Sequence, residues 1–573
     1  MERRFLGDYR YITSAEKAEL YRDEIKDMNI SVLGVDTETT GLDPLENKIR
    51  LVQIAVKDMP VYIFDIDKIG SDGIKALREV LTGSETKVFH NAKFDLKFLH
   101  TIGIEINSNV FDTMLAEQVI VSGSTFKGFK LSEVANKYLG ITLEKELQKS
   151  NWTRELTSRQ LKYAANDVKI LADIYEKQLA ILEELDLLDT ADLENKTVIP
   201  TYKMELAGFR LDRKAVRDLK VDIIEERVEL SQKLQELLPD VDNYNSPAQV
   251  KTALLEMGLD IKSTENDELI RFKDDYIEVD TLLQYKKIMR RISLLDGLVK
   301  SISRKTERIH SSYWQNSTKT GRYSCTDPNL QGVPNAKEFR RCFAADDGNS
   351  LVIADYSQIE LRIIAEVADD ETMIGIFNRG EDIHKLTAAL VNKKPVEEVT
   401  QMERQSAKAM NFGLIYGMGY NSFQQYAKNN YGVDLTYEET RNAVDLFFLT
   451  YRSIGERLDI LDSLFTLEER TLGGRRRLWE KKPIITERAN AAIQGTGADI
   501  LKQALVYIND NLLNDDVKLI ATVHDEIILE CPQEQADRVS AELKSLMEQA
   551  GSKYLKKVLV VAELAIGNNW SEK

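Results

Sequence analysis

The stretch VKLIATVHDEIILEC, residues 517–531, sets two adjacent carboxylates, Asp525 and Glu526, between two apolar runs. Apolar, β-branched runs on both sides of a short polar break are typical of two strands joined by a turn. We therefore predict a short β hairpin or a sharp strand bend, with His524, Asp525 and Glu526 at its tip. A solvated turn is the ordinary explanation for such a pair. Another explanation requires a partner elsewhere in the chain.

The N-terminal third alternates between strand-like and helical segments. Residues 28–66 hold three apolar runs punctuated by Gly, Asp and Pro, and KVFHN (87–91) is a further short run. Alternation of this kind predicts an α/β domain. From 212 to 300 the pattern is helical with both charge signs on the outer faces, and Ser246 followed by Pro247 marks a helix start.

Beyond residue 300 the pattern changes again. LVIADYSQIELRIIAEV (351–367) predicts a strand that leads into a helix. Helical sequence continues to about 510, and three apolar runs, the last of them VLVVAELAIG (558–567), predict closing strands. We therefore expect a multidomain chain of α/β and α+β type.

The charge distribution bears on the class of partner. The 573 residues carry a formal net charge of −17, which by itself argues weakly against nucleic acid. Basic residues nevertheless concentrate in two segments, 308–341 and GGRRRLWEKK (473–482). Because local patches bind phosphates, we expect both segments to be candidates for nucleic-acid contact.

The sequence features that bear on localisation indicate the cytoplasm. No apolar run approaches the roughly 18 residues that span a bilayer, and the N-terminus, MERRFLGDYRYITSAEKAEL, has no apolar leader core. The three cysteines are widely spaced and form no CxxC pair, so neither a disulfide framework nor a zinc site is indicated. We expect a cytoplasmic protein without membrane contact, associated with the nucleoid if the source is bacterial.

A first acidic set lies in the N-terminal third. Asp36 and Glu38 are two residues apart on a predicted strand, so both side chains project from one face. Asp95 follows in HNAKFDLKFL (90–99), while Tyr163 and Asp167 are four residues apart on one side of a predicted helix. Each piece alone is more typical of a surface position than of a metal site.

Together these residues resemble the 3′–5′ exonucleases of the RNase H-like fold, in the version with four acids and a tyrosine. The resemblance implies metal ligation by Asp36, Glu38, Asp95 and Asp167, with Tyr163 orienting the attacking water. Mg²⁺ prefers oxygen ligands, and two such ions clamp the attacking water and the leaving oxygen of a phosphodiester.

A second set lies in RQSAKAMNFGLIYG (404–417). Arg404, Lys408, Phe412 and Tyr416 recur every four residues and predict one helical stripe of two cations and two aromatic rings. An amphipathic helix with a solvated basic end is an equally good explanation of this pattern alone. The functional explanation is a triphosphate held by the cations, with a base and sugar against the rings. Glycines 413 and 417 would let another chain or a base pair approach closely.

DYSQIELR (355–362), RQSAKAMNFGLIYG and VHDE (523–526) occur in the order of the three polymerase motifs of family A DNA polymerases, which the chain resembles. STKTGRYSCTDPNLQ (317–331) is similar to the segment upstream of that family's palm, and GGRRR to its late finger region. With the exonuclease, the resemblance covers nearly the whole chain from about residue 31. It implies no N-terminal 5′-nuclease domain.

The resemblance implies a role for each matching residue. Two Mg²⁺ ions per active site, which Mn²⁺ replaces in some enzymes, would be bound at the polymerase site by Asp355, Asp525 and the carbonyl of Tyr356. Glu360 would exclude ribonucleotides, Phe412 would face the sugar 3′ side, and Lys408 would also protonate the leaving pyrophosphate. The remaining nucleotide contacts would be Arg404, Tyr416, Gln358 and His384. Primer and template contacts would be Arg322, Asn490, Gln494 and His524. Glu526 would be a support rather than a ligand.

The expected organisation is an RNase H-like exonuclease domain (1–195) followed by a right-hand polymerase (196–573). Its thumb would span 196–315, its palm, with an antiparallel sheet, 316–375 and 509–573, and its fingers 376–508. The expected function is template-directed addition of dNTPs to a primer 3′ end, with proofreading by the exonuclease. We expect a monomer. Its partners would be primer-template DNA and separate 5′-nuclease or replication proteins. The alternatives are an exonuclease whose polymerase half only binds DNA, and a non-catalytic scaffold.

Four positions depart from the family's usual pattern. Gly332 follows NLQ where Asn is common, Tyr323 replaces an aliphatic residue or Phe, Thr522 replaces a frequent Gln, and Thr486 stands where bacterial members often have Arg. These departures bear on minor-groove checking and primer grip, and the metal-binding acids are unaffected.

Overall fold

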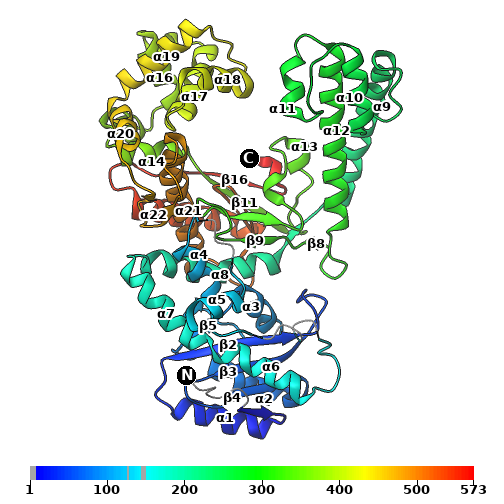
Figure 1. Ribbon diagram of the computed structural model, residues 1–573, viewed down its shortest axis with the longest axis vertical. Coiled ribbons are helices and arrows are strands. Elements are labelled where there is room, and N and C mark those ends of the chain that lie inside the picture. The colour runs from blue at the N-terminus through cyan, green and yellow to red at the C-terminus, as the bar shows by residue number, and fades with distance from the viewer. Residues whose placement is uncertain (1–7, 125–127, 144–146, 148–149) are drawn as a thin grey trace.

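The computed structural model describes residues 8–124, 128–143, 147 and 150–573, and has two halves along its long axis (Figure 1). The N-terminal half, blue to cyan, forms one end. In the other half a central sheet lies between two groups of helices, green on one side and yellow on the other. Residues 1–7, on which part of the expectation about a leader depends, lie outside the described residues.

The N-terminal half is the predicted α/β domain, built on a six-stranded mixed sheet whose two edge strands the sequence analysis did not identify. The strand order is β1-β4-β3-β2-β5-β6, in which β3 is antiparallel to both of its neighbours and the other pairs are parallel. β3 and β4 are buried along their whole length because their sequences are nearly continuous apolar runs. The strands are β1 (Tyr9–Ile12), β2 (Val32–Thr39), β3 (Ile49–Ala55), β4 (Val61–Asp65), β5 (Thr86–Phe89) and β6 (Val110–Asp112).

Helices cover this sheet and connect it to the other half. The last one, α8, contacts α3 and α4 on the N-terminal side and β14 and α21 on the C-terminal side. The helices are α1 (Ala15–Asp27), α2 (Ile66–Leu81), α3 (Ala92–Thr101), α4 (Thr113–Ile120), α5 (Leu131–Leu139), α6 (Ser158–Lys169), α7 (Leu171–Glu184) and α8 (Leu188–Ala207).

A four-stranded antiparallel sheet forms the centre of the C-terminal half. Its order is β14-β15-β11-β16, so β11 pairs with the hairpin on one edge and with the last strand on the other. Helices α21 and α22 pack on each other, and α22 packs on β11. The elements are β11 (Asn349–Tyr356), α14 (Ile359–Ala368), α21 (Ile485–Asn511), β14 (Lys518–Val523), β15 (Glu526–Pro532), α22 (Ala536–Tyr554) and β16 (Ala562–Gly567). The predicted closing strand over 558–567 therefore begins only at Ala562.

The green helices form an arm with a small core of its own at the tip, which includes Leu234, Leu254 and Leu282. Within the arm α9 packs along α12. Ser246 caps α10 as predicted, since its hydroxyl accepts a hydrogen bond from the backbone N–H of Gln249. The arm consists of α9 (Arg213–Leu237), α10 (Pro247–Glu256), α11 (Asn266–Leu269) and α12 (Ile277–Lys300).

Short elements link the arm to the central sheet. Two two-stranded ribbons and one short helix lie there: β7 (Phe209–Arg210) with β8 (Arg308–Ile309), β9 (Ser312–Trp314) with β10 (Ser324–Thr326), and α13 (Lys337–Arg340).

The yellow helices form a lobe on the opposite side of the sheet from the arm. Its helices are α15 (Glu371–Asn378), α16 (Ile383–Asn392), α17 (Gln401–Leu414), α18 (Tyr420–Tyr431), α19 (Tyr437–Thr450) and α20 (Arg452–Ser463). The hairpin of β12 (Glu468–Arg470) and β13 (Arg476–Leu478) follows. In the part of the chain that the structure describes, no helix is long and apolar enough to span a membrane.

Candidate active sites

The sheet brings Asp355 and Asp525 together although they lie 170 positions apart in the sequence. Val523 pairs with Glu526, so His524 and Asp525 form the two-residue turn of the predicted hairpin. Asp355 lies opposite Glu526 on the next strand. Both residues line one cavity, and burial, followed by the charge of Asp355, raises the pKa of Asp525 to about 7.

A cavity of about 430 Å³ opens over this carboxyl pair. Its lining combines elements from the sheet, the yellow lobe and α21, so three regions of the chain meet at the acids. Eight residues predicted as polymerase site residues line it: Arg322, Asp355, Tyr356, Gln358, Glu360, Phe412, His524 and Asp525.

Glu360 is held in place from two sides. Arg322 donates a hydrogen bond to its Oε1, and the hydroxyl of Tyr416 donates one to its Oε2. Tyr416 is itself buried, and burial followed by the charge of Glu360 raises the pKa of its hydroxyl far above the ordinary value. The carboxylate of Glu360 therefore has a fixed orientation at the edge of the cavity.

The predicted stripe on α17 is correct for three of its four members. Arg404, Lys408 and Phe412 lie on the helix, but α17 ends at Leu414 and Tyr416 lies in the turn beyond it. Tyr416 therefore reaches Glu360 from the turn rather than from the helical face.

The cations of α17 and the predicted imidazole lie outside the cavity lining. Arg404 pairs with Asp382 at 2.8 Å, whereas Lys408 makes no salt bridge with any described residue. His384 is 3% exposed, its Nδ1 lies 2.9 Å from the side-chain amide of Asn411, and its ring lies 5.6 Å from that of Phe412. Burial lowers the pKa of His384 to about 4, so the imidazole is neutral at pH 7.

Asn490 and Gln494, the predicted template contacts, are one turn apart on α21 and also lie outside the cavity lining. Gln494 interacts with the hydroxyl of Tyr416, which places it beside Glu360. The side-chain oxygen of Asn490 is buried and has no hydrogen-bond partner among the described residues. This oxygen is a free acceptor for a donor on a ligand.

Two of the four departures from the family pattern have structural roles. The hydroxyl of Thr522 donates to the backbone carbonyl of Glu526 at 2.9 Å and so closes the hairpin turn that holds Asp525. The hydroxyl of Tyr323 lies 2.6 Å from that of Thr201 on α8. Nothing in the structure explains Gly332 or Thr486.

Glu526, which the resemblance implied to be a support, is buried beside the polymerase acids. It is 3% exposed and accepts hydrogen bonds from Trp570 at 2.5 Å, Lys573 at 2.8 Å and Arg340 at 3.3 Å. Lys573 also forms a salt bridge with Asp355. The sequence analysis missed Trp570 and Lys573, because GNNWSEK carries no pattern that would connect it to the acids.

The five predicted exonuclease residues come from three elements: Asp36 and Glu38 from β2, Asp95 from α3, and Tyr163 and Asp167 from α6. Burial, followed by the charge of Asp167, raises the pKa of Asp36 to about 8. Burial and then the neighbouring acids also raise the pKa values of Glu38 and Asp95. Like charges this close disfavour the ionised forms of one another, and a bound cation would favour them.

Tyr163 and Thr37 position members of this set. Tyr163 hydrogen-bonds to Asp167, one turn away on α6. The hydroxyl of Thr37, between the two acids of β2, donates to Asp95 at 2.6 Å. β2 and α3 are therefore connected at the acids themselves, while the second hydrogen bond lies within α6.

The polymerase acids suit Mg²⁺ better than a metal ion that only protein side chains would coordinate. Among the described residues no three His, Cys, Asp or Glu side chains are arranged so that they could hold a metal ion by themselves. Mg²⁺ is usually bound by one or two carboxylates together with water and substrate phosphates. One oxygen of Asp355 is buried without a hydrogen-bond partner, which leaves it available to a cation.

Two arginines of the second basic segment are buried rather than open to phosphates, whereas Lys481 and Lys482 of the same segment are exposed. Arg475 is 3% exposed and pairs with Glu194 at 2.6 Å and Asp499 at 2.7 Å. Arg476 is 8% exposed and donates to the carbonyl of Ile120. These guanidinium groups bind the β12–β13 hairpin to the N-terminal half instead of facing solvent.

The expectation for Gly413 is also wrong. A Cβ at this position would lie 3.0 Å from the ring of Phe423 and 3.1 Å from that of Tyr426, both on α18. The close approach that glycine allows is therefore made by the chain's own aromatic rings.

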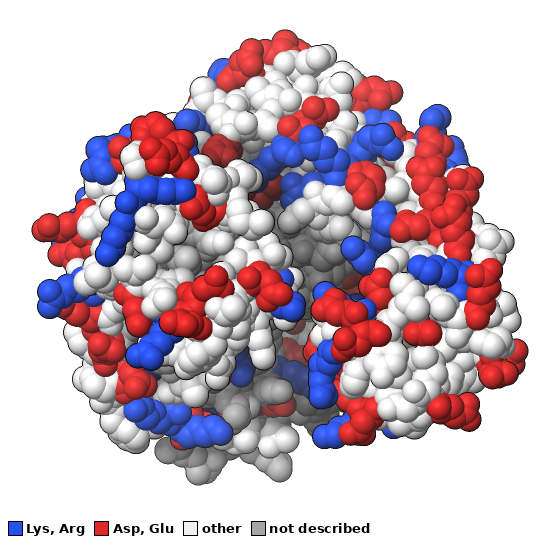
Figure 2. Space-filling view, turned by 90° about the horizontal axis from the view of Figure 1, so that it is seen from above, with Lys and Arg blue, Asp and Glu red and all other residues white. Residues whose placement is uncertain are grey.

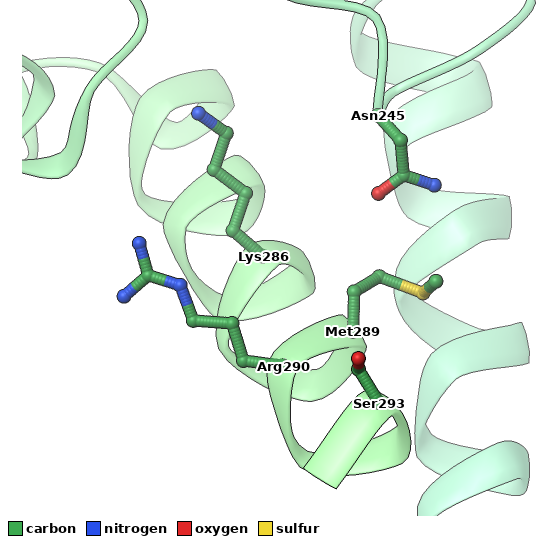
Figure 3. A pocket seen from close by; sticks show the side chains of 5 residues that line it. All are labelled: Asn245, Lys286, Met289, Arg290 and Ser293. Carbon is green, nitrogen blue, oxygen red and sulfur yellow. The ribbon is translucent and has the colours of Figure 1, made fainter. Parts of the chain in front are cut away.

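Cations also occur on the arm. The surface is hollowed between the arm and the lobe, and Lys and Arg side chains border this hollow (Figure 2). On α12, Lys286 and Arg290 extend to the same side, beside a shallow pocket of about 300 Å³ (Figure 3). The five residues that line this pocket include no acid, so it is a candidate for phosphate contact and not for metal chemistry.

Comparisons with known proteins agree with this arrangement. The sequence model of DNA polymerase family A matches residues 213–572, and that of a 3′–5′ exonuclease matches residues 9–183. Similar proteins include DNA polymerase I of Aquifex aeolicus, 34% identical over 99% of this chain and 100% of that protein. DNA polymerase I of Synechocystis is 29% identical over 98% of this chain, which spans 62% of that relative's length.

A solved structure supports the fold. The POL domain of Pol1 from M. smegmatis, in a complex with DNA primer-template and dNTP, superimposes with a TM-score of 0.85. The two sequences are 24% identical, and the match covers 98% of this chain and 99% of that one. The matching sequence models, the relatives and this fold show that the chain belongs to DNA polymerase family A and carries a 3′–5′ exonuclease domain ahead of the polymerase sequence.

Proposed function

We propose that this chain extends a DNA primer on a template and removes mismatched 3′ ends with a separate active site. The observation that carries the proposal is the cavity over Asp355 and Asp525, which also holds Arg322, Glu360 and Phe412. A guanidinium group, a fixed carboxylate and an aromatic ring around the two acids suit a nucleoside triphosphate.

The two acids would bind the divalent ions at the polymerase site together with the carbonyl of Tyr356. When bound, two Mg²⁺ ions would neutralise the triphosphate and lower the pKa of the primer 3′ hydroxyl. Lys408 would then grip the phosphates and protonate the leaving pyrophosphate. Arg404 would exchange its pairing with Asp382 for a phosphate oxygen.

The residues around the cavity would select the nucleotide and hold the primer. Glu360, fixed by Arg322 and Tyr416, would block a 2′ hydroxyl, and Phe412 would pack against the sugar. His384 would act on the nucleotide through Phe412, because the imidazole is buried and its ring lies against the ring of Phe412. Gln358 would contact the nucleotide, and template and primer contacts are assigned to Arg322, Asn490, Gln494 and His524.

The exonuclease acids Asp36, Glu38, Asp95 and Asp167 would bind a second pair of metal ions, with Tyr163 positioning the attacking water. Their mutual repulsion supports this assignment, since four clustered carboxyl groups without a cation would destabilise the fold. A mismatched primer end that frays would reach this site and be hydrolysed there.

These assignments correspond to an exonuclease domain over 1–195 and a polymerase domain over 196–573. The arm and its connection would be the thumb (196–315), the central sheet the palm (316–375 and 509–573), and the yellow lobe with α21 the fingers (376–508). Because both acid sets lie in one chain, we propose that a monomer suffices. The free, buried cysteines suit the reducing cytoplasm as the place of action.

Primer extension with Mg²⁺ and four dNTPs tests the proposal. Wild type should extend a recessed primer, and Asp525→Ala should not, while both digest a mismatched 3′ end. Asp36→Ala should show the reverse pattern. If no variant and no wild-type protein extends the primer while digestion persists, the alternative of an exonuclease with a DNA-binding polymerase half is correct.

A further inference from the structure

The last residues of the chain are anchored beside the polymerase acids by Trp570. Its side chain is fully buried, its ring packs 5.4 Å from that of Phe343, and its backbone N–H donates to the carbonyl of Phe343 at 2.9 Å. Its indole N–H donates to Glu526. The short helix at Trp570–Glu572 therefore has a fixed position next to the central sheet.

This anchor carries the Lys573 ammonium to a place between two neighbouring strands. Lys573 forms salt bridges with Asp355 on β11 and with Glu526 on β15, and these two acids are partners in the strand register. Its side chain is 23% exposed. Within the described residues no other cation forms a salt bridge with Asp355.

The two oxygens of Asp355 are in different situations. Lys573 contacts Oδ2, while Oδ1 is buried without a hydrogen-bond partner. Glu526 differs, because Arg340 and Trp570 hold it in addition to Lys573. Loss of Lys573 would therefore release Asp355 and leave Glu526 with two of its three donors.

We propose that the Lys573 ammonium is an internal counter-cation of the polymerase acids, which competes with a divalent ion for Asp355. It neutralises Asp355 in the metal-free protein and moves toward Glu526 when the metal binds. The inference rests on the proposed function, in which Asp355 and Asp525 bind metal ions. A positive charge beside a carboxylate weakens the binding of a second cation, so removal of Lys573 tightens it.

Mn²⁺ binding to the full chain without DNA, measured by loss of the free-ion EPR signal, tests this competition. All variants are made in a background of Asp36→Ala with Asp167→Ala, so that Mn²⁺ bound by the exonuclease acids does not contribute to the measured binding. We expect Lys573→Ala to lower the Kd for Mn²⁺ about fivefold, the size expected for one partly exposed ion pair. The Mg²⁺ concentration for half-maximal primer extension should fall by a similar factor in the exonuclease-competent protein.

Two matched variants control for charge and structure. Lys573→Arg keeps the cation, and Lys557→Ala removes an exposed lysine that pairs with Asp369, so both should bind Mn²⁺ within twofold of the background protein. Unchanged or weaker Mn²⁺ binding by Lys573→Ala would overturn the inference, and a misfolded variant could not imitate tighter binding.

Asp355→Asn separates this inference from the proposed function. If it weakens Mn²⁺ binding while Lys573→Ala changes nothing, the metal site stands and the competition is wrong. If Asp355→Asn leaves Mn²⁺ binding unchanged, the metal site itself is wrong, and the inference falls with it.

Discussion

At the scale of single residues, we propose that selectivity for the sugar depends on how firmly Glu360 is held. Arg322 and Tyr416 each donate to one oxygen of this carboxylate, so it has little freedom to move away from a 2′ hydroxyl. The sequence pattern identified all three residues but not their contact, because Tyr416 lies beyond the end of α17. Gly417, with φ of +77°, is part of the turn that brings it there.

We expect Tyr416→Phe to weaken discrimination against ribonucleotides modestly and Glu360→Ala to weaken it strongly. Tyr416→Phe keeps the ring and removes one hydrogen bond, whereas Glu360→Ala removes the block itself. The ratio of kcat/KM for dNTP and for the matching rNTP measures both. Equal effects of the two variants would mean that Tyr416 does more than orient Glu360.

The exonuclease acids predict how stability changes with pH in the metal-free protein. The pKa of Asp36 is raised to about 8 in the folded state, while an unfolded chain ionises Asp near pH 4. The folded state therefore binds more protons between these values, and the free energy of unfolding falls as pH rises. We expect a loss of up to about 2 kcal/mol in EDTA from pH 6.5 to 8.

Urea unfolding in EDTA at a series of pH values measures this loss. Asp36→Asn should reduce the loss, and added Mg²⁺ should do the same in the parent protein. Stability that stays constant or rises over this range would contradict the assignment of a buried, mutually repelling acid set.

At the scale of elements, the β12–β13 hairpin joins the two halves of the molecule. Arg475 pairs with Glu194 on α8 and Asp499 on α21, and the N–H of Leu478 donates to the carbonyl of Ser122. Lys502 also pairs with Glu194 and is fully buried. The sequence showed a run of arginines, but the acids that neutralise them are distant in the chain, so their burial could not be predicted.

Arg475→Met should destabilise the protein by about 3–5 kcal/mol, because it leaves Glu194 and Asp499 buried with less compensating charge. Lys57→Met is the matched control. Its ion pair with Glu176 is about half exposed, so its loss should cost less than about 1 kcal/mol. Thermal or urea unfolding measures both, and equal, small effects would show that the hairpin pairing contributes little to the fold.

At the scale of the whole molecule, the chain is acidic overall yet presents cations around the hollow between arm and lobe (Figure 2). Lys286 and Arg290 border a second hollow together with Asn266 and Asp267 of α11, which lies on the side of the arm that faces the lobe (Figure 1). The net charge of −17 alone suggested little about nucleic acid. The placement of charge is the relevant quantity.

Binding of primer-template DNA should therefore weaken steeply with salt despite the negative net charge. We expect the plot of log Kd against log salt concentration to be linear, as for proteins that neutralise several phosphates. Lys286→Ala with Arg290→Ala should reduce its slope by about one to two units, whereas Lys57→Ala should leave it unchanged. A slope that does not respond to the α12 variants would exclude this face from the DNA path.

Sequence reasoning predicted the strands, the arm helices and the grouping of Asp355 with Asp525, because apolar periodicity and family motifs carry that information. It could not predict contacts that depend on the final position of the chain, such as Lys573 with Asp355 or Thr522 with the hairpin turn. Those contacts join segments that no sequence motif or periodicity links to each other.

The central claim is that Asp355 and Asp525 perform nucleotide addition while a separate acid set removes 3′ ends. Single-turnover reaction of one mismatched primer-template with Mg²⁺ and dNTPs, followed for both longer and shorter products, tests it most directly. Wild type should first shorten and then extend the primer, Asp525→Asn should only shorten it, and Asp36→Asn should not shorten it. Extension by Asp525→Asn at the wild-type rate would contradict the account.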